Sequence, residues 1–343
     1  MRRLGAAIAG LAAAAAVSAG TAGADGLPVG AIEIGPSGVT APGWPMRYVA
    51  LRAGPRTLVA SVEKDGGRVV GTWVLDGRFT VPAVALDGSP GGLSADGRTL
   101  VLIRPRAAFP RRQTSFALLD TPTASVRDVF ALRGDFSFDA ISPNGSLLYL
   151  VQYVDPEDPS RYVVRGYDVR SGRLLPEPVV DPKVFGDVMR GYPLTRETSP
   201  DGRWAYTLYD GGGTEPFVHA LDTATRTAAC IVLDALAGRA DLTEIRLSYA
   251  AGEGELRAAA PGGETLAAID TETLQVLEPA AAEPEPDTEP AAGSDTAGPP
   301  AEKGSGSPGP PLVLSAFLAG AVLAGLAAIV RVTLRRRGLA ATR

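Results

Sequence analysis

The chain has few side chains of the kinds that most often carry catalysis. His219 is its only histidine and Cys230 its only cysteine. A metal site built on several histidines, a second histidine for acid–base work and an intramolecular disulfide are therefore excluded by count. His219 falls within the predicted strand 216–221 and Cys230 within the apolar stretch 228–233. We expect a structural histidine and a cysteine that packs as a small hydrophobe, an exposed reactive thiol being the alternative.

The remaining candidates are charged residues in predicted loops. Loops 155–158 (DPED) and 210–215 (DGGGTE) carry carboxylates, the loop 104–112 carries four arginines, and the long connection 181–192 adds apolar side chains. The candidate binding residues are Arg104, Arg106, Arg111, Arg112, Asp155, Glu157, Asp158, Phe185, Met189, Asp210 and Glu215. No spacing fixes two carboxylates at the separation that a glycosidase needs. We predict no catalytic residue, no metal ligand and no cofactor; the alternative for the charged loops is plain solvated surface.

These loops alternate with a sequence unit that recurs along the chain. Its clearest copy, 199–225, begins with Ser-Pro-Asp-Gly, in which Pro and Gly favour the backbone angles of a tight turn. It ends with Asp-Thr-Ala-Thr, whose side chains can bond nearby amides. Counterparts of the first turn begin at Arg52, Ser94, Ser142, Ser199 and Ser248, and those of the second at Asp76, Asp120, Asp168, Asp222 and Asp270. Both markers keep a spacing of 42 to 57 residues, which predicts five repeats.

Each repeat contains short runs suited to a pleated sheet. The predicted strands are 57–62, 68–75, 99–103, 115–119, 147–154, 162–167, 203–209, 216–221, 255–259, 265–269 and 274–277, with an earlier strand at 31–34 that could pair with the last repeat. A period of roughly 40 to 50 residues with about four short strands is typical of a propeller blade. We predict an all-β fold, a β-propeller of about five four-stranded blades, with six or seven possible, plus one C-terminal transmembrane helix.

The Ser-Pro-Asp-Gly turn, the apolar strand after it and the Asp-x-x-Thr turn resemble the WD40-like repeats of bacterial propellers. The resemblance covers roughly residues 45–278, and the Trp-Asp and Gly-His signatures of the eukaryotic type are absent. It implies the fold and is nearly silent on activity, because such propellers host many functions. If the strand order resembles that of other propellers, the loops 64–66, 104–112, 155–158 and 210–215 share one face with the connection 181–192, and the turns occupy the other. Binding is expected on the face with the varied loops.

The two ends of the chain predict export and anchoring. Residues 1–24 have the layout of a signal peptide, an uncleaved signal anchor being the alternative. Residues 25–278 form the propeller, and the Pro-, Ala- and Glu-rich segment 279–311 is a disordered spacer. Residues 312–334 form a transmembrane helix, followed by a basic cytoplasmic tail, 335–343, placed by the positive-inside bias. We expect a single-pass cell-membrane protein with its propeller outside the cytoplasm.

Composition narrows the function. A net charge of −5 disfavours a nucleic-acid binder, and the Ala, Gly, Arg and Pro bias indicates a high-GC bacterium. Small residues four apart, from Ala316 to Ala328, favour a helix-mediated homodimer, unless they only reflect an Ala-rich chain. The expected partners are membrane lipid and an unknown extracytoplasmic protein or saccharide. We predict a non-catalytic ligand- or protein-binding module, the alternatives being an exported hydrolase or lyase that uses loop carboxylates and a structural adaptor for another membrane protein.

Overall fold

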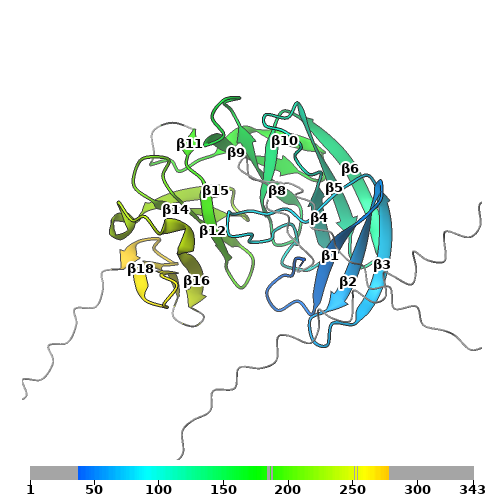
Figure 1. Cartoon of the computed structure of the whole chain (residues 1–343), viewed down its shortest axis with the longest axis horizontal. Coiled ribbons are helices and arrows are strands. Elements are labelled where there is room, and N and C mark those ends of the chain that lie inside the picture. Colours follow the sequence, from blue (N-terminus) through cyan, green and yellow to red (C-terminus); the bar gives the residue numbers. More distant parts are fainter. Residues whose placement is uncertain (1–37, 184–185, 187, 251, 253, 278–343) are drawn as a thin grey trace, which may run out of the picture. The chain divides into compact units, whose positions relative to one another are not determined.

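The computed structural model describes residues 38–277, apart from 184, 185, 187, 251 and 253. All of them belong to one compact unit. They form β-strands and two short 3-10 helices, Asp234–Leu236 and Leu242–Glu244 (Figure 1). The described chain is therefore all-β, as predicted.

The predicted signal peptide, the strand at 31–34, the spacer, the transmembrane helix and the basic tail lie outside the described residues. Among the described residues, no helix is long and apolar enough to cross a bilayer.

The described strands form five antiparallel sheets in which consecutive strands pair. Sheet 1 contains β1 (Met46–Ala53), β2 (Arg56–Glu63) and β3 (Val69–Asp76), and sheet 2 contains β4 (Thr99–Ile103), β5 (Gln113–Asp120) and β6 (Ser125–Arg133). Sheet 3 contains β7 (Phe136–Ile141), β8 (Leu147–Tyr153), β9 (Arg161–Asp168), β10 (Arg173–Val179) and the short β11 (Met189–Arg190), which pairs with β9. Sheet 4 contains β12 (Pro193–Thr198), β13 (Trp204–Tyr209), β14 (Phe217–Asp222) and β15 (Thr227–Val232), and sheet 5 contains β16 (Arg246–Ala250), β17 (Glu255–Ala259), β18 (Thr265–Asp270) and β19 (Val276–Leu277).

The Ser-x-Asp-Gly sequences form the turns that were predicted. At 199–202, the Ser199 hydroxyl donates to Asp201 Oδ1 (2.6 Å) and accepts the N–H of Trp204 (2.8 Å), while Gly202 takes a φ of 70°. The same bonds recur at Ser94 and, with Asn in place of Asp, at Ser142. These three turns join the first and second strand positions of repeats 2, 3 and 4.

The Asp-x-x-Thr sequences form the second predicted turn, between the third and fourth strands. In repeats 2, 3, 4 and 5 the Asp Oδ1 accepts the backbone N–H three residues later, at 2.6 to 3.1 Å, and the Asp residues are Asp120, Asp168, Asp222 and Asp270. A carboxylate that accepts a local amide favours the turn over continued strand.

The predicted alignment of the first repeat is wrong by one strand. At the start of β5, Thr114 Oγ1 donates to the carbonyl of Gly134 (3.0 Å) and accepts the N–H of Phe136 (2.9 Å). Thr57, at the start of β2, makes the same two bonds across the end of β3, at 2.9 and 2.8 Å. Strand β2 therefore matches the third strand of the second repeat, and β1 matches the second.

This shift changes the face of three predicted features: the loop 64–66, the segment 52–55, and Asp76, which ends β3 beside the segment 52–55 and so does not form a second turn. The loop 64–66 now joins a third strand to a fourth, so it lies with the turns and not with the varied loops, contrary to the prediction. The segment 52–55, interpreted as a first turn, lies with the varied loops instead. Its Gly-Pro composition suits a tight turn of either kind, which is why composition alone misplaced it.

The first strand position differs among the repeats. Sheets 3, 4 and 5 fill it with β7, β12 and β16, whereas in sheets 1 and 2 only isolated bridges pair there, Val39 with Tyr48 in sheet 1, and Thr80 with Ile103 and Leu93 with Leu100 in sheet 2.

Between the two bridges of sheet 2 the chain leaves the sheet as a crossing hairpin, residues 81–92, which extends to β12 (Figure 1). The amides of Leu86 and Asp87 donate to the carbonyls of Pro193 and Leu194, at 2.8 and 3.1 Å. The hairpin therefore links repeat 2 to repeat 4 directly.

Apolar clusters join each sheet to the next. Sheets 1 and 2 share a cluster that includes Val59 and Leu100, and sheets 2 and 3 share one that includes Phe116 and Leu148. Comparable clusters join sheet 3 to sheet 4 and sheet 4 to sheet 5. Among the described residues, sheets 2, 3 and 4 each pack against two neighbouring sheets and sheets 1 and 5 each pack against one. Packing of each sheet on the next is typical of propeller-like folds.

Candidate functional site

The varied loops of the described chain emerge at one end of the sheets, because the strands of each sheet alternate in direction. We call this end the loop face; its segments include 52–55, 104–112, 154–160, 180–192, 210–216 and 233–245. Two bonds tie the connection 180–192 to it, since Gly191 N–H donates to the carbonyl of Ser160 (3.1 Å) and Tyr192 N–H to Asp210 Oδ1 (2.8 Å). The predicted grouping of these loops is confirmed, apart from the loop 64–66.

Two of the four candidate arginines, Arg106 and Arg111, bond to residues of the protein itself instead of projecting from the loop into solvent. Arg106 Nη2 lies 2.6 Å from Asp135 Oδ1, with side chains only 5% and 3% exposed, and its guanidinium sits 5.0 Å from the Tyr153 ring centre. Arg111 donates its backbone N–H to the other Asp135 oxygen (2.8 Å) and its guanidinium to the carbonyl of Arg104 (2.9 Å). These two residues shape the loop 104–112 instead of presenting charge to a partner.

The other two arginines remain on the surface. Arg104 is exposed, with its guanidinium 5.6 Å from the centre of the Phe79 ring. Arg112 is also exposed. They give the part of the loop face above sheet 2 a positive charge.

The acidic loop of repeat 3 uses its aspartates to hold its own backbone. Asp155 accepts the N–H groups of Glu157 and Asp158 (3.0 and 3.2 Å), and Asp158 accepts both the hydroxyl and the N–H of Ser160 (2.6 and 2.9 Å). The Ser160 bonds lower the pKa of the Asp158 carboxyl, the opposite of what a general acid needs. Only Glu157 projects as an exposed carboxylate.

The acidic loop of repeat 4 follows the same plan. Asp210 Oδ1 accepts the N–H of Tyr192 and of Gly212, at 2.8 and 3.0 Å. Glu215 is exposed. The loop face therefore combines rigid turns with a few outward charges.

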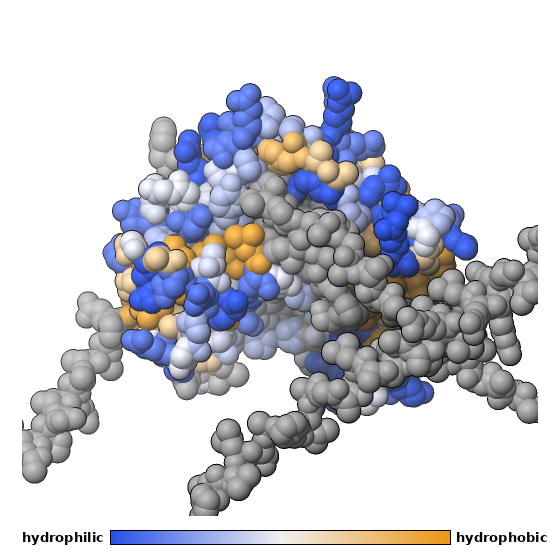
Figure 2. All heavy atoms as spheres, viewed as in Figure 1, coloured by the Kyte–Doolittle hydropathy of each residue, from blue (hydrophilic) through white to orange (hydrophobic). Residues whose placement is uncertain are grey.

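Sequence patterns missed the apolar residues on this face. Val154 and Val188 are each 43% exposed and flank the beginning of β9. Of the predicted apolar contacts, Met189 is half-buried, pairs with Tyr162 and packs against the core, while Phe185 lies outside the described residues. Figure 2, which views the molecule from one side, shows a largely hydrophilic surface with small separate hydrophobic areas.

A buried polar row crosses sheet 4. Arg196, Thr207, His219 and Cys230 are successive cross-strand partners. Arg196 forms an ion pair with Asp139 of β7, both nearly fully buried, and donates Nε–H to the Thr207 hydroxyl (2.6 Å). The charged residues inside two otherwise ordinary strands, Asp139 and Arg196, were the signal that sequence reasoning overlooked.

The two rare side chains lie farther along this row. Burial lowers the pKa of His219 to about 4, and its Nε2 has no hydrogen-bond partner among the described residues. Cys230 is half-buried, its N–H donates to Asp181 Oδ2 (2.8 Å), and burial raises its thiol pKa to about 11. His219 is buried within β14, the position expected of a structural histidine, and the high pKa of the Cys230 thiol disfavours the reactive thiolate.

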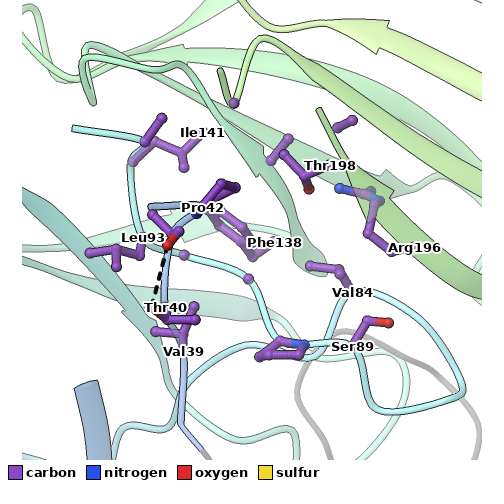
Figure 3. Close-up of a pocket in the computed structure, with 18 of the residues that line it drawn as sticks. Val39, Thr40, Pro42, Val84, Ser89, Leu93, Phe138, Ile141, Arg196 and Thr198 are labelled. Carbon is purple, nitrogen blue, oxygen red and sulfur yellow. Dashed lines mark hydrogen bonds between the residues drawn. The ribbon is translucent and has the colours of Figure 1, made fainter. Parts of the chain in front are cut away.

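A cavity of about 450 Å³ lies beside the buried ion pair, between the first strands of sheets 3 and 4 and the crossing hairpin (Figure 3). Val84 and Ser89 of the hairpin, Phe138 of β7, and Arg196 and Thr198 of β12 face it in this view. Its wall also includes Ala95, Gly202 and Thr223 from the turns, so it belongs to the end of the sheets opposite the loop face. Within the described ranges, no group of three or more His, Cys, Asp or Glu side chains is placed to hold a metal ion.

No protein-family model matches the chain, and no curated protein matches its sequence. Similar solved structures include Kuenenia stuttgartiensis hydrazine synthase (15% identity, 71% of this chain and 58% of that chain, TM-score 0.40) and TolB from Acinetobacter baumannii (15%, 67% and 51%, 0.39). BamB from Moraxella catarrhalis is a third (18%, 71% and 64%, 0.39). The aligned part spans 51% to 64% of those three chains. The chain's own strand pairing, rather than these matches, defines its fold.

Proposed function

We propose that the protein is an exported, membrane-anchored β-propeller of five WD40-like blades that binds a partner protein non-catalytically through its loop face. Five sheets with a four-position plan support the blade number, once the isolated bridges are counted as first strands. The uncharged segment 312–330 and the arginines after it support the anchor.

The observation that carries the binding proposal is that some residues of the loop face hold the loops in place while others are left exposed. Asp155, Asp158 and Asp210 hold loop backbone in place. Val154 and Val188 are left exposed beside the outward charges of Glu157 and Arg190. An apolar centre with a charged rim on a preformed frame is the usual composition of a protein-binding surface.

Site-specific photo-crosslinking in intact membranes tests this proposal. A photoreactive residue at Val154 or Val188 should crosslink one discrete partner, and the same residue at the exposed turn position Thr123 should not. Equal crosslinking from both faces would contradict a dedicated loop-face interface. Turnover of an ester, lactone or glycoside that is lost in Asp155→Asn or Asp210→Asn would replace binding with catalysis.

The anchor is tested separately. Full-length protein should resist extraction from membranes by alkaline carbonate, and protein shortened before residue 312 should be released. Release of the full-length protein would remove the anchor from the proposal and leave the binding surface untouched.

A further inference from the structure

The cavity beside the Arg196–Asp139 pair has the size and lining of a small-molecule site. Its volume of about 450 Å³ lies within the ~300–1,000 Å³ that such sites commonly occupy. Apolar walls from Val84, Phe138 and Ile141 alternate with a few polar groups (Figure 3). The cavity lies at the end of the sheets opposite the loop face and is distinct from the proposed partner surface.

Its polar groups are held in place before any ligand arrives. Asp139 is the extra residue of a β-bulge in β7, because Phe138 and Ala140 pair with consecutive residues of β8. Bulges re-aim side chains next to functional sites. Arg196 is fixed by bonds to the Asp139 carboxylate, the Asp139 carbonyl and the Thr207 hydroxyl. A fixed guanidinium loses little freedom when it binds a ligand.

Hydrogen-bonding capacity remains in the lining. The guanidinium has five N–H donors, and those three bonds leave two of them without a partner among the described residues. The Thr198 hydroxyl makes no hydrogen bond to another described residue, and the half-buried Glu197 carboxyl, which accepts the backbone N–H of Thr198, can accept further bonds. Arg196 and Thr198 project from one side of β12 and Glu197 from the other, so the cavity offers donors and an acceptor from both sides of this strand.

The charges of the lining cancel. Arg196 is matched by Asp139 in an ion pair, and the remaining charged residues of the lining are one carboxylate, Glu197, and one ammonium group, Lys64. Burial raises the pKa of Glu197, which further weakens any preference for a cation. A neutral ligand is favoured, and hydroxyl groups suit it best because each one both donates and accepts.

We infer that this cavity is a binding site for a neutral polyhydroxylated ligand of mono- or disaccharide size, held by Arg196, Glu197 and Thr198. Hydroxyls of the ligand accept from the guanidinium and donate to the Glu197 carboxyl. Its apolar ring face packs on the Val84 and Phe138 side of the cavity.

Calorimetric titration of the full-length protein in a detergent without a sugar headgroup tests the inference. The probes are D-glucose, D-galactose, N-acetyl-D-glucosamine, maltose and trehalose, with choline as the cationic and glycine betaine as the zwitterionic comparator. At least one saccharide should bind with one-to-one stoichiometry, and Glu197→Gln should weaken it about 10- to 100-fold, as expected for a hydrogen bond to a charged group. Thr198→Val should weaken the same saccharide, and Glu215→Gln, on the loop face, should not.

Several results would overturn the inference: no binding by any saccharide in the panel, binding of choline or betaine alone, or saccharide binding unchanged in both Glu197→Gln and Thr198→Val. If the melting temperatures of the variants are unchanged, a loss of binding is local to the cavity. If Glu197→Gln does not fold, the result for Thr198→Val decides the test. Photo-crosslinking at Val154 is independent of all these outcomes, so failure of the cavity site and failure of the loop-face function are distinguishable.

Discussion

The first strand position of the repeats differs between the two halves of the described chain. Repeats 3, 4 and 5 fill it with continuous strands, whereas in repeats 1 and 2 only isolated bridges pair there, and repeat 2 sends the crossing hairpin out of it. The second, third and fourth positions are alike in most repeats because local turn bonds fix them. The first position depends on contacts with other sheets, so it is free to vary, and its variation provides one wall of the cavity.

We call repeats 3, 4 and 5, which have continuous first strands, the regular half, and repeats 1 and 2 the irregular half. The substitution Arg196→Met changes the regular half and should have the largest effect on stability. It leaves Asp139 buried without its counter-charge, which is expected to lower the free energy of unfolding by about 3–5 kcal/mol, measured by urea titration. The double variant with Asp139→Leu should recover most of the loss. Arg68→Met, which removes a solvent-exposed ion pair in sheet 1, should change stability little; a loss equal to that of Arg196→Met would mean that burial does not set the difference.

Acid should weaken the regular half through His219. Its folded pKa, about 4, lies below the ordinary histidine pKa of 6.5, so the unfolded chain binds the proton more tightly. The stability is complete above pH 6.5 and is lost as the pH falls toward 4, by about 3 kcal/mol. The unfolding free energy of His219→Gln should fall less over this interval than that of the wild type, and parallel curves would exclude the histidine as the cause.

The Thr57 and Thr114 hydroxyls test whether β2 and β5 occupy the same strand position in repeats 1 and 2. Both residues are fully buried and make the same two bonds. Thr57→Val and Thr114→Val should each cost about 2 kcal/mol, measured by thermal and urea unfolding. A neutral Thr57→Val beside a costly Thr114→Val would contradict the alignment of β2 with β5.

The substitution Leu86→Ala changes the crossing hairpin of repeat 2, in the irregular half, and should have the smallest effect on stability. Leu86 is half-buried against the core between sheets 4 and 5, so its truncation should cost about 1 kcal/mol, less than a fully buried leucine. Hydrogen exchange should speed up in residues 82–91 and stay unchanged in β13 and β14. Faster exchange throughout sheet 4 would show that the hairpin supports the regular half as well.

Much of this fold follows from short sequence patterns. The Ser-x-Asp-Gly and Asp-x-x-Thr turns form as predicted because their bonds join residues a few positions apart. Predicted strands such as 99–103 and 255–259 coincide with β4 and β17. The first repeat was misaligned because a Gly-Pro turn looks alike on either face, while the Thr, Gly and Phe spacing shared by Thr57 and Thr114 carried the correct register.

The site was harder to predict because its contacts are distant in sequence. Arg106 and Asp135 are 29 residues apart, and Arg196 and Asp139 are 57 apart. A lone arginine in a loop has the same local pattern whether it is solvated or buried on a partner. Only the packing of neighbouring sheets distinguishes the two cases, so Arg106 and Arg111 were assigned to the surface and Arg196 was not noticed.

The crossing hairpin also limits how this gene can change. Arrays of similar modules commonly gain or lose a member by recombination, since each member contacts only the next. Here the amides of Leu86 and Asp87 must meet β12 at a set distance along the array. Inserting or deleting one module between repeats 2 and 4 is therefore expected to break these two bonds, so this part of the array should tolerate a change in module number less well than an array without such a link.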